Sequence, residues 1–208
     1  DLFREENSSY FDEALFEKQS AKAEQRLDVK FSKNTDMQIS GKVMSNFMSY
    51  LKHQIEFCST LSGYAQLQEN SLIGTRDIFQ AIEAYLLFRP EVSREKIIEG
   101  IGFIDSNGRA PRQYSLPLTK ISMPRMDLRP YIDQGIWIVN TIITYLKFTN
   151  DFTIIREMTG YYDVIDGPAK VVKRSDIKDT VFEHILRIMD YLISNIDEET
   201  KCLRTLFG

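Results

Sequence analysis

The motif "IGTRD", residues 73–77, places an arginine and an aspartate side by side at the expected start of a helix. A guanidinium offers a fork of hydrogen-bond donors, and a carboxylate accepts hydrogen bonds from two hydroxyls, so Arg76 and Asp77 could clamp a polyol such as a sugar. Gln80, one helical turn further on, could extend this polar surface. The simpler interpretation is that Asp77 favours the positive end of the helix dipole while Arg76 is solvated.

A second polar group lies on a segment that is otherwise apolar on nearly every side. Asp133, Gln134 and Trp137 have the spacing that puts a carboxylate, an amide and an indole on one face of a helix. Because buried polar groups need partners, this face either bonds to neighbouring helices or lines a cavity. An aromatic ring beside a carboxylate suits a carbohydrate, and both interpretations stay open at this point.

The segment Ser106–Met126 holds three prolines and a glycine and is too long for a simple connector. Loops beyond about 12 residues in a compact domain are usually functional or disordered. This loop carries Arg112 and Gln113 in the motif "GRAPRQY". Loop arginines are ordinarily solvated, but a long loop must be held by something, so both residues are candidates for ligand binding.

The rest of the chain is dominated by apolar residues at helical spacing, which predicts an all-α fold of paired helices. A short alternating segment, Leu27–Ser32, is the one stretch that favours a strand or an extended linker. Periodicity does not choose among a bundle, a solenoid and a toroid. The expected helices are Ser9–Leu27, Ser40–Cys58, Thr75–Phe88, a helix from after Ser93 to Asp105, Pro130–Thr149, Phe152–Tyr162 capped by Asp151, and Ser175–Ile196.

Composition excludes several classes of function. With 208 residues, of which 43% are hydrophobic, the chain can bury a sizeable core. A net charge of -4 with scattered Lys and Arg argues against nucleic-acid and anionic-membrane partners. No apolar run approaches a membrane span, and no signal-peptide pattern is present. Two widely separated cysteines argue against a disulfide framework, so we expect a cytoplasmic protein.

Cysteine and histidine usage predicts no metal site. The two cysteines lie far apart in the sequence, and the two histidines stand alone. His184 is expected to be a core histidine that bonds to a nearby oxygen. Neither a nucleophilic triad nor a phosphate-binding glycine loop can be recognised.

Four segments, taken in order, resemble the inverting glycoside phosphorylases of glycoside hydrolase family 94, such as cellobiose and chitobiose phosphorylase and their β-glucan-acting relatives. They are "NSLIGTRDIFQAIEA", "GRAPRQYSLP", "DLRPYIDQGIWIVNTIITYLKFTNDFTIIREMTGYYD" and "FEHILRIMDYLISNIDEETKCLRTLFG". The resemblance covers most of the chain from about Ser40 onward. It implies a catalytic (α/α)6 toroid preceded by a linker helix, with residues 1–38 as linker helix and extended connector and residues 39–208 as the first half of the toroid.

The resemblance also implies roles for the polar residues. Arg76 and Asp77 match the family's Gly-x-Arg-Asp signature, which implies that they contact the sugar where the bond breaks. The segment "YIDQGIW" resembles one that lines the same pocket with paired acids and a tryptophan, and Gln134 replaces an acid there. Arg112 and Gln113 depart from a loop that more often carries a histidine. Such departures suggest a glucan other than cellobiose, and β-1,2-linked oligoglucans are the leading expectation.

The chemistry implied by the resemblance is attack of inorganic phosphate on the anomeric carbon while the leaving oxygen is protonated, giving α-glucose 1-phosphate with inversion. Phosphate is the co-substrate, and no metal or organic cofactor is expected. The implied partners are a β-linked gluco-oligosaccharide, phosphate and the remainder of the catalytic domain, and a homodimer is one expected assembly of the full-length enzyme.

The family's general acid is the last aspartate of a Gly-Asp-Trp-Asn-Asp motif, and by resemblance Gly208 opens that motif. We therefore expect the proton donor just after Gly208, no catalytic residue within this chain, and no activity of the chain alone. Two alternatives stay open: a glycoside hydrolase on the same toroid, and a non-catalytic helical sugar-binding or interaction module.

Overall fold

The computed structural model describes residues 41–60, 72–117, 122–129, 133–166 and 171–204, together with residues 14, 17, 18 and 21. The chain divides into two units, Asp1–Gln54 and Ile55–Gly208. Helix α3 (Gly41–Thr60) confirms the helix expected at Ser40–Cys58. Most of the expected linker helix and the whole extended segment that follows it lie outside the described residues, so these two predictions stay predictions.

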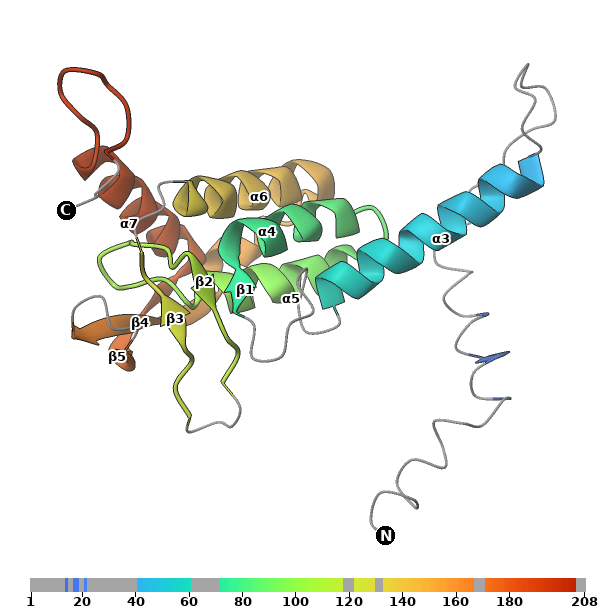
Figure 1. Cartoon of the computed structure of the whole chain (residues 1–208), viewed down its shortest axis with the longest axis horizontal. Helices are drawn as coiled ribbons and strands as arrows, with labels where there is room; N and C mark the ends of the chain where they lie inside the picture. The colour runs from blue at the N-terminus through green and yellow to red at the C-terminus, as the bar shows by residue number, and fades with distance from the viewer. Residues whose placement is uncertain are drawn as a thin grey trace, which may run out of the picture. The chain divides into compact units, whose positions relative to one another are not determined.

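Helices α4 (Thr75–Tyr85), α5 (Pro90–Ile101) and α6 (Gln134–Thr149) pack on one another, and α7 (Val181–Ser194) packs against α5 and α6 (Figure 1). All four lie where the apolar spacing predicts helices. Helix α5 begins earlier than expected because Pro90 occupies its first turn, where a missing N–H costs nothing. None of the helices within the described ranges is both long and apolar enough to cross a bilayer.

The core lies between the facing surfaces of these helices. Helix α4 buries one face at helical spacing, and Gly100 on α5 allows the close approach of α4, because a Cβ there would lie 2.8 Å from the ring of Phe79. The Thr141 hydroxyl of α6 donates to the Phe79 carbonyl at 3.2 Å. The buried apolar residues of the three helices are Ile78, Phe79, Ile82, Tyr85, Ile97, Ile101, Ile138, Ile142 and Tyr145.

A small antiparallel sheet holds the long segment after α5 against the start of α4. Its strands are β1 (Ile73–Gly74), β2 (Gln113–Tyr114) and β3 (Met126–Asp127), in the order β1-β2-β3. Thr75 completes the attachment, because its backbone N–H donates to the carbonyl of Arg112 at 3.1 Å and its hydroxyl donates to that of Pro111 at 2.6 Å. The loop is therefore held by the backbone at the base of α4.

The all-α prediction is wrong between residues 158 and 180, where β4 (Met158–Asp166) and β5 (Val171–Thr180) form an antiparallel hairpin. The predicted helix at Phe152–Tyr162 is only the short 3-10 helix η2 (Ile154–Arg156) followed by a strand. The hairpin is rich in Thr, Tyr, Val and Ile, which favour a pleated surface.

The predicted helix at Ser175–Ile196 begins six residues late because Thr180 and Glu183 form a capping box. Thr180 Oγ1 accepts a hydrogen bond from the Glu183 backbone at 3.2 Å, and the Glu183 carboxylate accepts one from the Thr180 backbone at 2.9 Å. The backbone N–H groups of Thr180 and Glu183, which have no partner within the helix, are thereby hydrogen-bonded. Helix α7 therefore starts directly after the last residue of β5.

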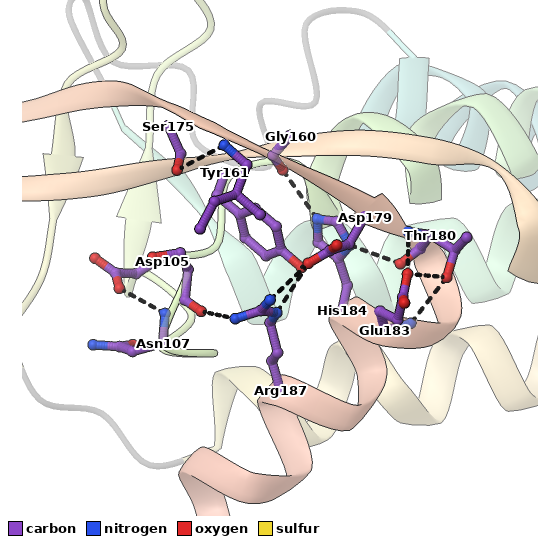
Figure 2. Close-up of polar contacts among 12 residues, drawn as sticks. Asp105, Asn107, Gly160, Tyr161, Ser175, Asp179, Thr180, Glu183, His184 and Arg187 are labelled. Carbon is purple, nitrogen blue, oxygen red and sulfur yellow. Dashed lines mark hydrogen bonds and ion pairs between the residues drawn. The ribbon is translucent and has the colours of Figure 1, made fainter.

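Helix α7 is anchored to the hairpin by polar side chains (Figure 2). The fully buried His184 stacks on Tyr161 at 4.0 Å, and its ring nitrogens lie 2.8 Å and 3.0 Å from the carbonyl oxygens of Thr180 and Gly160. The prediction that His184 is a core histidine is confirmed. Arg187 adds an ion pair with Asp179 at 2.8 Å.

The end of α6 is fastened to α5 by a charged network. Arg94 pairs with Asp151 at 3.1 Å and with Glu157 at 2.6 Å, and Tyr145 donates to Asp151 at 2.8 Å. The hydrogen bonds from the hydroxyls of Thr153 and Tyr145 lower the pKa of Asp151 to about 2.

We expect Gly108→Ala to lower the free energy of unfolding by about 2–4 kcal/mol. Gly108 has a φ of 91°, and a Cβ there would overlap the carbonyl of Arg187. Urea unfolding checks this value. Gly160→Ala is the matched control, because its Cβ would meet only the carbonyl oxygen of Ile177 at 3.8 Å. Equal stability of the Gly108→Ala variant and the wild type would contradict the prediction.

The Asp151 network predicts a pH dependence of stability. Because the pKa of Asp151 falls from 3.8 to about 2 on folding, its contribution is complete above pH 4 and is lost as the pH falls towards 2. Asp151→Asn should therefore be less stable than the wild type at pH 7, with a difference that shrinks below pH 4. Unfolding curves across pH 2–7 measure this, with exposed Asp176→Asn as the control. A stability difference between Asp151→Asn and the wild type that does not change with pH would contradict the lowered pKa of Asp151 in the network.

Candidate functional site

The starts of α4 and α6 lie next to each other and bring together residues 57 positions apart in the sequence. Arg76 Nη1 lies 3.2 Å from Asp133 Oδ2, and Trp137 Nε1 donates to the same oxygen at 3.2 Å. Asp133 occupies the N-cap position of α6, but its side chain makes no cap hydrogen bond. The carboxylate is instead directed to the guanidinium and the indole.

Asp77 completes the group, which we call the Arg76 cluster: Arg76, Asp77, Asp133 and Trp137. Asp77 Oδ1 lies 3.7 Å from Arg76 Nε. Its carboxylate folds back over Gly74, and a Cβ at Gly74 would overlap Asp77 Oδ2. The glycine before the Arg-Asp pair is therefore needed for the position of this carboxylate.

The cluster is partly open to solvent. The side chains of Arg76, Asp77 and Asp133 are 45%, 35% and 33% exposed, so their polar atoms can exchange water for the hydroxyls of a ligand. The half-buried Trp137 supplies an apolar ring beside two carboxylates. This arrangement can accept hydrogen bonds from sugar hydroxyls, donate to sugar oxygens and contact sugar C–H groups.

The other four predicted site residues lie on α4, on α6 and at or next to β2, without a described hydrogen bond to the cluster. Gln80 is exposed on α4. Gln134 is 3% exposed, and its side-chain oxygen has no hydrogen-bond partner among the described residues. Gln113 lies in β2 opposite Gly74, and Arg112 precedes it with its guanidinium 3.6 Å from Asp127.

Asp127 is a residue that the sequence analysis missed. It is 1% exposed in β3 and pairs with Arg129 at 2.6 Å and with Arg112 at 3.6 Å. The hydrogen bond from Arg129 holds the pKa of Asp127 below its usual range. The alternation in "RMDLR" is the signal that could have identified it, since residues two apart share a face of a strand. Asp127 helps to hold Arg112 beside the start of α4.

Within the described ranges, no three His, Cys, Asp or Glu side chains come close enough together to hold an ion. The side chains of the Arg76 cluster offer hydrogen bonding and charge.

Comparison with known proteins identifies the family. Residues 25–205 match the catalytic domain of the glycosyl hydrolase 94 superfamily, and the chain belongs to this family of carbohydrate-active enzymes. It is similar to solabiose phosphorylase from Paenibacillus borealis, with 30% identity over 130 residues, and to cellobionic acid phosphorylase from Neurospora crassa, with 27% identity over 123 residues. These matches cover 62% and 59% of the chain but 14% of each relative, so the matched part spans about a seventh of their length.

We expect the pair of Arg76 and Asp133 to contribute little to stability. Partly exposed ion pairs are typically worth about 0.2–1 kcal/mol, because water screens them. A double-mutant cycle with Arg76→Ala, Asp133→Ala and the double variant, measured by urea unfolding, should give a coupling energy in this range. The pair of Arg94 and Asp151 gives a comparison cycle. A coupling above about 2 kcal/mol would mean that the Arg76 pair is structural.

Proposed function

We propose that this chain supplies part of the sugar-binding pocket of an inverting glycoside phosphorylase, which cleaves β-linked glucosides or oligoglucans with inorganic phosphate and releases α-glucose 1-phosphate. The observation that carries the proposal is the meeting of Arg76, Asp133 and Trp137 at the starts of two packed helices. The chain belongs to the glycosyl hydrolase 94 superfamily and is similar to two phosphorylases whose names give different substrates.

In this proposal the Arg76 cluster holds the glucosyl unit next to the bond that breaks. Asp77 and Asp133 accept hydrogen bonds from sugar hydroxyls, Arg76 donates to sugar oxygens, and Trp137 contacts the apolar edge of the ring. Charge-assisted hydrogen bonds of this kind fix the orientation of the anomeric carbon for in-line attack by phosphate. None of these residues is assigned as the proton donor.

The remaining candidates extend the pocket. Arg112 and Gln113 are held next to Thr75 by backbone hydrogen bonds, which suits a role in binding the leaving part of the glucan. Gln80 and Gln134 flank the cluster on α4 and α6. A β-1,2-linked oligoglucan is the leading substrate in this proposal, with phosphate as co-substrate and no organic cofactor.

The proposed architecture is the (α/α)6 toroid. The alternation of α4, α5, α6 and α7, with α4 and α6 starting at one end, suits successive helix pairs of such a ring. The remainder of the catalytic domain would then be the principal partner of this chain. The hairpin β4–β5 is an addition between two of the helices rather than a member of the ring.

Two other functions remain to be separated from phosphorolysis. A hydrolase on the same toroid would release reducing sugar without phosphate. A non-catalytic sugar-binding module would bind glucans and produce neither product.

The deciding experiment incubates the full-length protein with β-linked gluco-oligosaccharides of each linkage, with and without inorganic phosphate. Phosphorolysis requires glucose 1-phosphate that appears only with phosphate, and NMR of the first product should detect the α anomer. Release of glucose that is independent of phosphate would instead establish the hydrolase.

Asp77→Asn in the full-length protein should lower kcat/KM by about 100-fold, because a carboxylate that accepts two hydroxyl hydrogen bonds contributes about 3 kcal/mol. Initial rates of glucose 1-phosphate formation measure this. The control is Asp176→Asn, an exposed acid on β5, which should leave the rate unchanged. Equal rates for the two variants would contradict the assignment of Asp77 to the sugar-binding site.

A further inference from the structure

A hollow of about 420 Å³ lies between the end of α5 and the hairpin β4–β5, lined by residues that the proposed sugar pocket does not use. The polar and charged residues of its lining include Thr159, Tyr162, Arg174, Ser175 and Lys178. Pockets that hold small ligands measure about 300–1,000 Å³, so the hollow has room for a ligand well above the size of a single inorganic ion.

The hairpin is irregular where it borders the hollow. Gly160 pairs with Lys178 and Tyr162 pairs with Arg174, so the register shifts between these two pairs. Residues 175–177 of β5 therefore lie opposite the single residue Tyr161 of β4, which is a bulge. Bulges are frequent beside functional sites.

Two cations in the hollow lack a carboxylate among the described residues. Arg174 donates to the Tyr162 hydroxyl at 3.1 Å, and within the described ranges no carboxylate lies within ion-pair distance of Arg174 or Lys178. The one carboxylate in the lining is Glu99, which is already paired with Lys96 at 3.0 Å. The hollow therefore has a net positive charge in a chain whose net charge is negative.

The polar groups of the hollow are accessible. Arg174 and Lys178 are both exposed, and the residue opposite Lys178 is a glycine, Gly160, which places no side chain over it. The Thr159 hydroxyl makes no described hydrogen bond. The aromatic rings are unsuited to stacking on a neutral sugar, because Phe103 covers one face of Tyr162 at 5.5 Å and the Arg174 guanidinium lies over the ring at 5.7 Å.

We propose that this hollow is a second ligand site, separate from the Arg76 cluster, that binds a small phosphate ester such as a phosphorylated sugar. Arg174 and Lys178 hold the phosphate, since arginine and lysine are the usual partners of phosphate oxygens. The hydroxyls of Thr159 and Tyr162 bind the polar groups of the ester. The hollow is too large for inorganic phosphate alone, so the organic part contributes to binding.

The experiment is hydrogen exchange, followed by mass spectrometry, on the full-length protein with glucose 6-phosphate as the probe. We expect slower exchange of the backbone amides in residues 158–166 and 171–180, a smaller effect with inorganic phosphate, and none with glucose. Absence of slower exchange in these two strands would overturn the proposal. Slower exchange confined to residues 75–85 and 134–149 would also overturn it, because the probe would then occupy the sugar pocket.

Charge variants test the assignment of residues. Lys178→Gln should weaken binding of glucose 6-phosphate by about tenfold, because it removes a charged donor. Lys173→Gln is the matched control, since Lys173 lies on the same strand outside the hollow, and its affinity should stay within about twofold of the wild type. Equal affinities for the two variants would overturn the proposal.

The outcome is independent of the proposed function. If the protein binds glucose 6-phosphate at the hairpin but forms no glucose 1-phosphate, the proposed phosphorylase activity is refuted and the proposed second ligand site is retained.

Discussion

The close contact between α4 and α6 is the constraint on which the rest of this structure depends. The two helices are separated by the whole of α5 and a long loop, yet the Thr141 hydroxyl reaches the Phe79 carbonyl in the buried interior. The burial of apolar side chains between packed helices supplies most of the free energy of folding, whereas exposed ion pairs supply little. The meeting of Arg76 and Asp133 is thus a result of helix packing rather than its cause.

Asp127 and Asp133, both near the starts of α4 and α6, differ in burial. The Asp127 side chain is 1% exposed, whereas those of its partners Arg112 and Arg129 are 28% and 63% exposed. Loss of both arginines would therefore leave the buried carboxylate without a charged partner. Asp133 lies at the surface, where its contacts with Arg76 and Trp137 can be exchanged for others. The carboxylates of Asp127 and Asp133 therefore differ in how readily they can exchange partners with solvent.

The sequence predicted the helices well because their apolar residues recur with a period that depends only on local geometry. It failed at residues 158–180 because Tyr161, Tyr162 and Ile177 can be placed on either a helix or a strand, and the pairing of β4 with β5 decided between them. The meeting of Arg76 with Asp133 could not be derived from spacing, since it depends on how distant segments pack. The contact of Asp127 with Arg112 could not be derived either, because it depends on the pairing of β2 with β3, whereas its pairing with Arg129 is local.

The absence of any residue between β5 and α7 makes their junction intolerant of insertions. Thr180 is the last residue of the strand and also the cap of the helix, so the direction of the strand fixes where the first turn of α7 begins. One added residue would rotate the helix by about 100° and carry His184 away from the carbonyl of Gly160. Changes of chain length in relatives of this protein should therefore avoid the junction of β5 and α7.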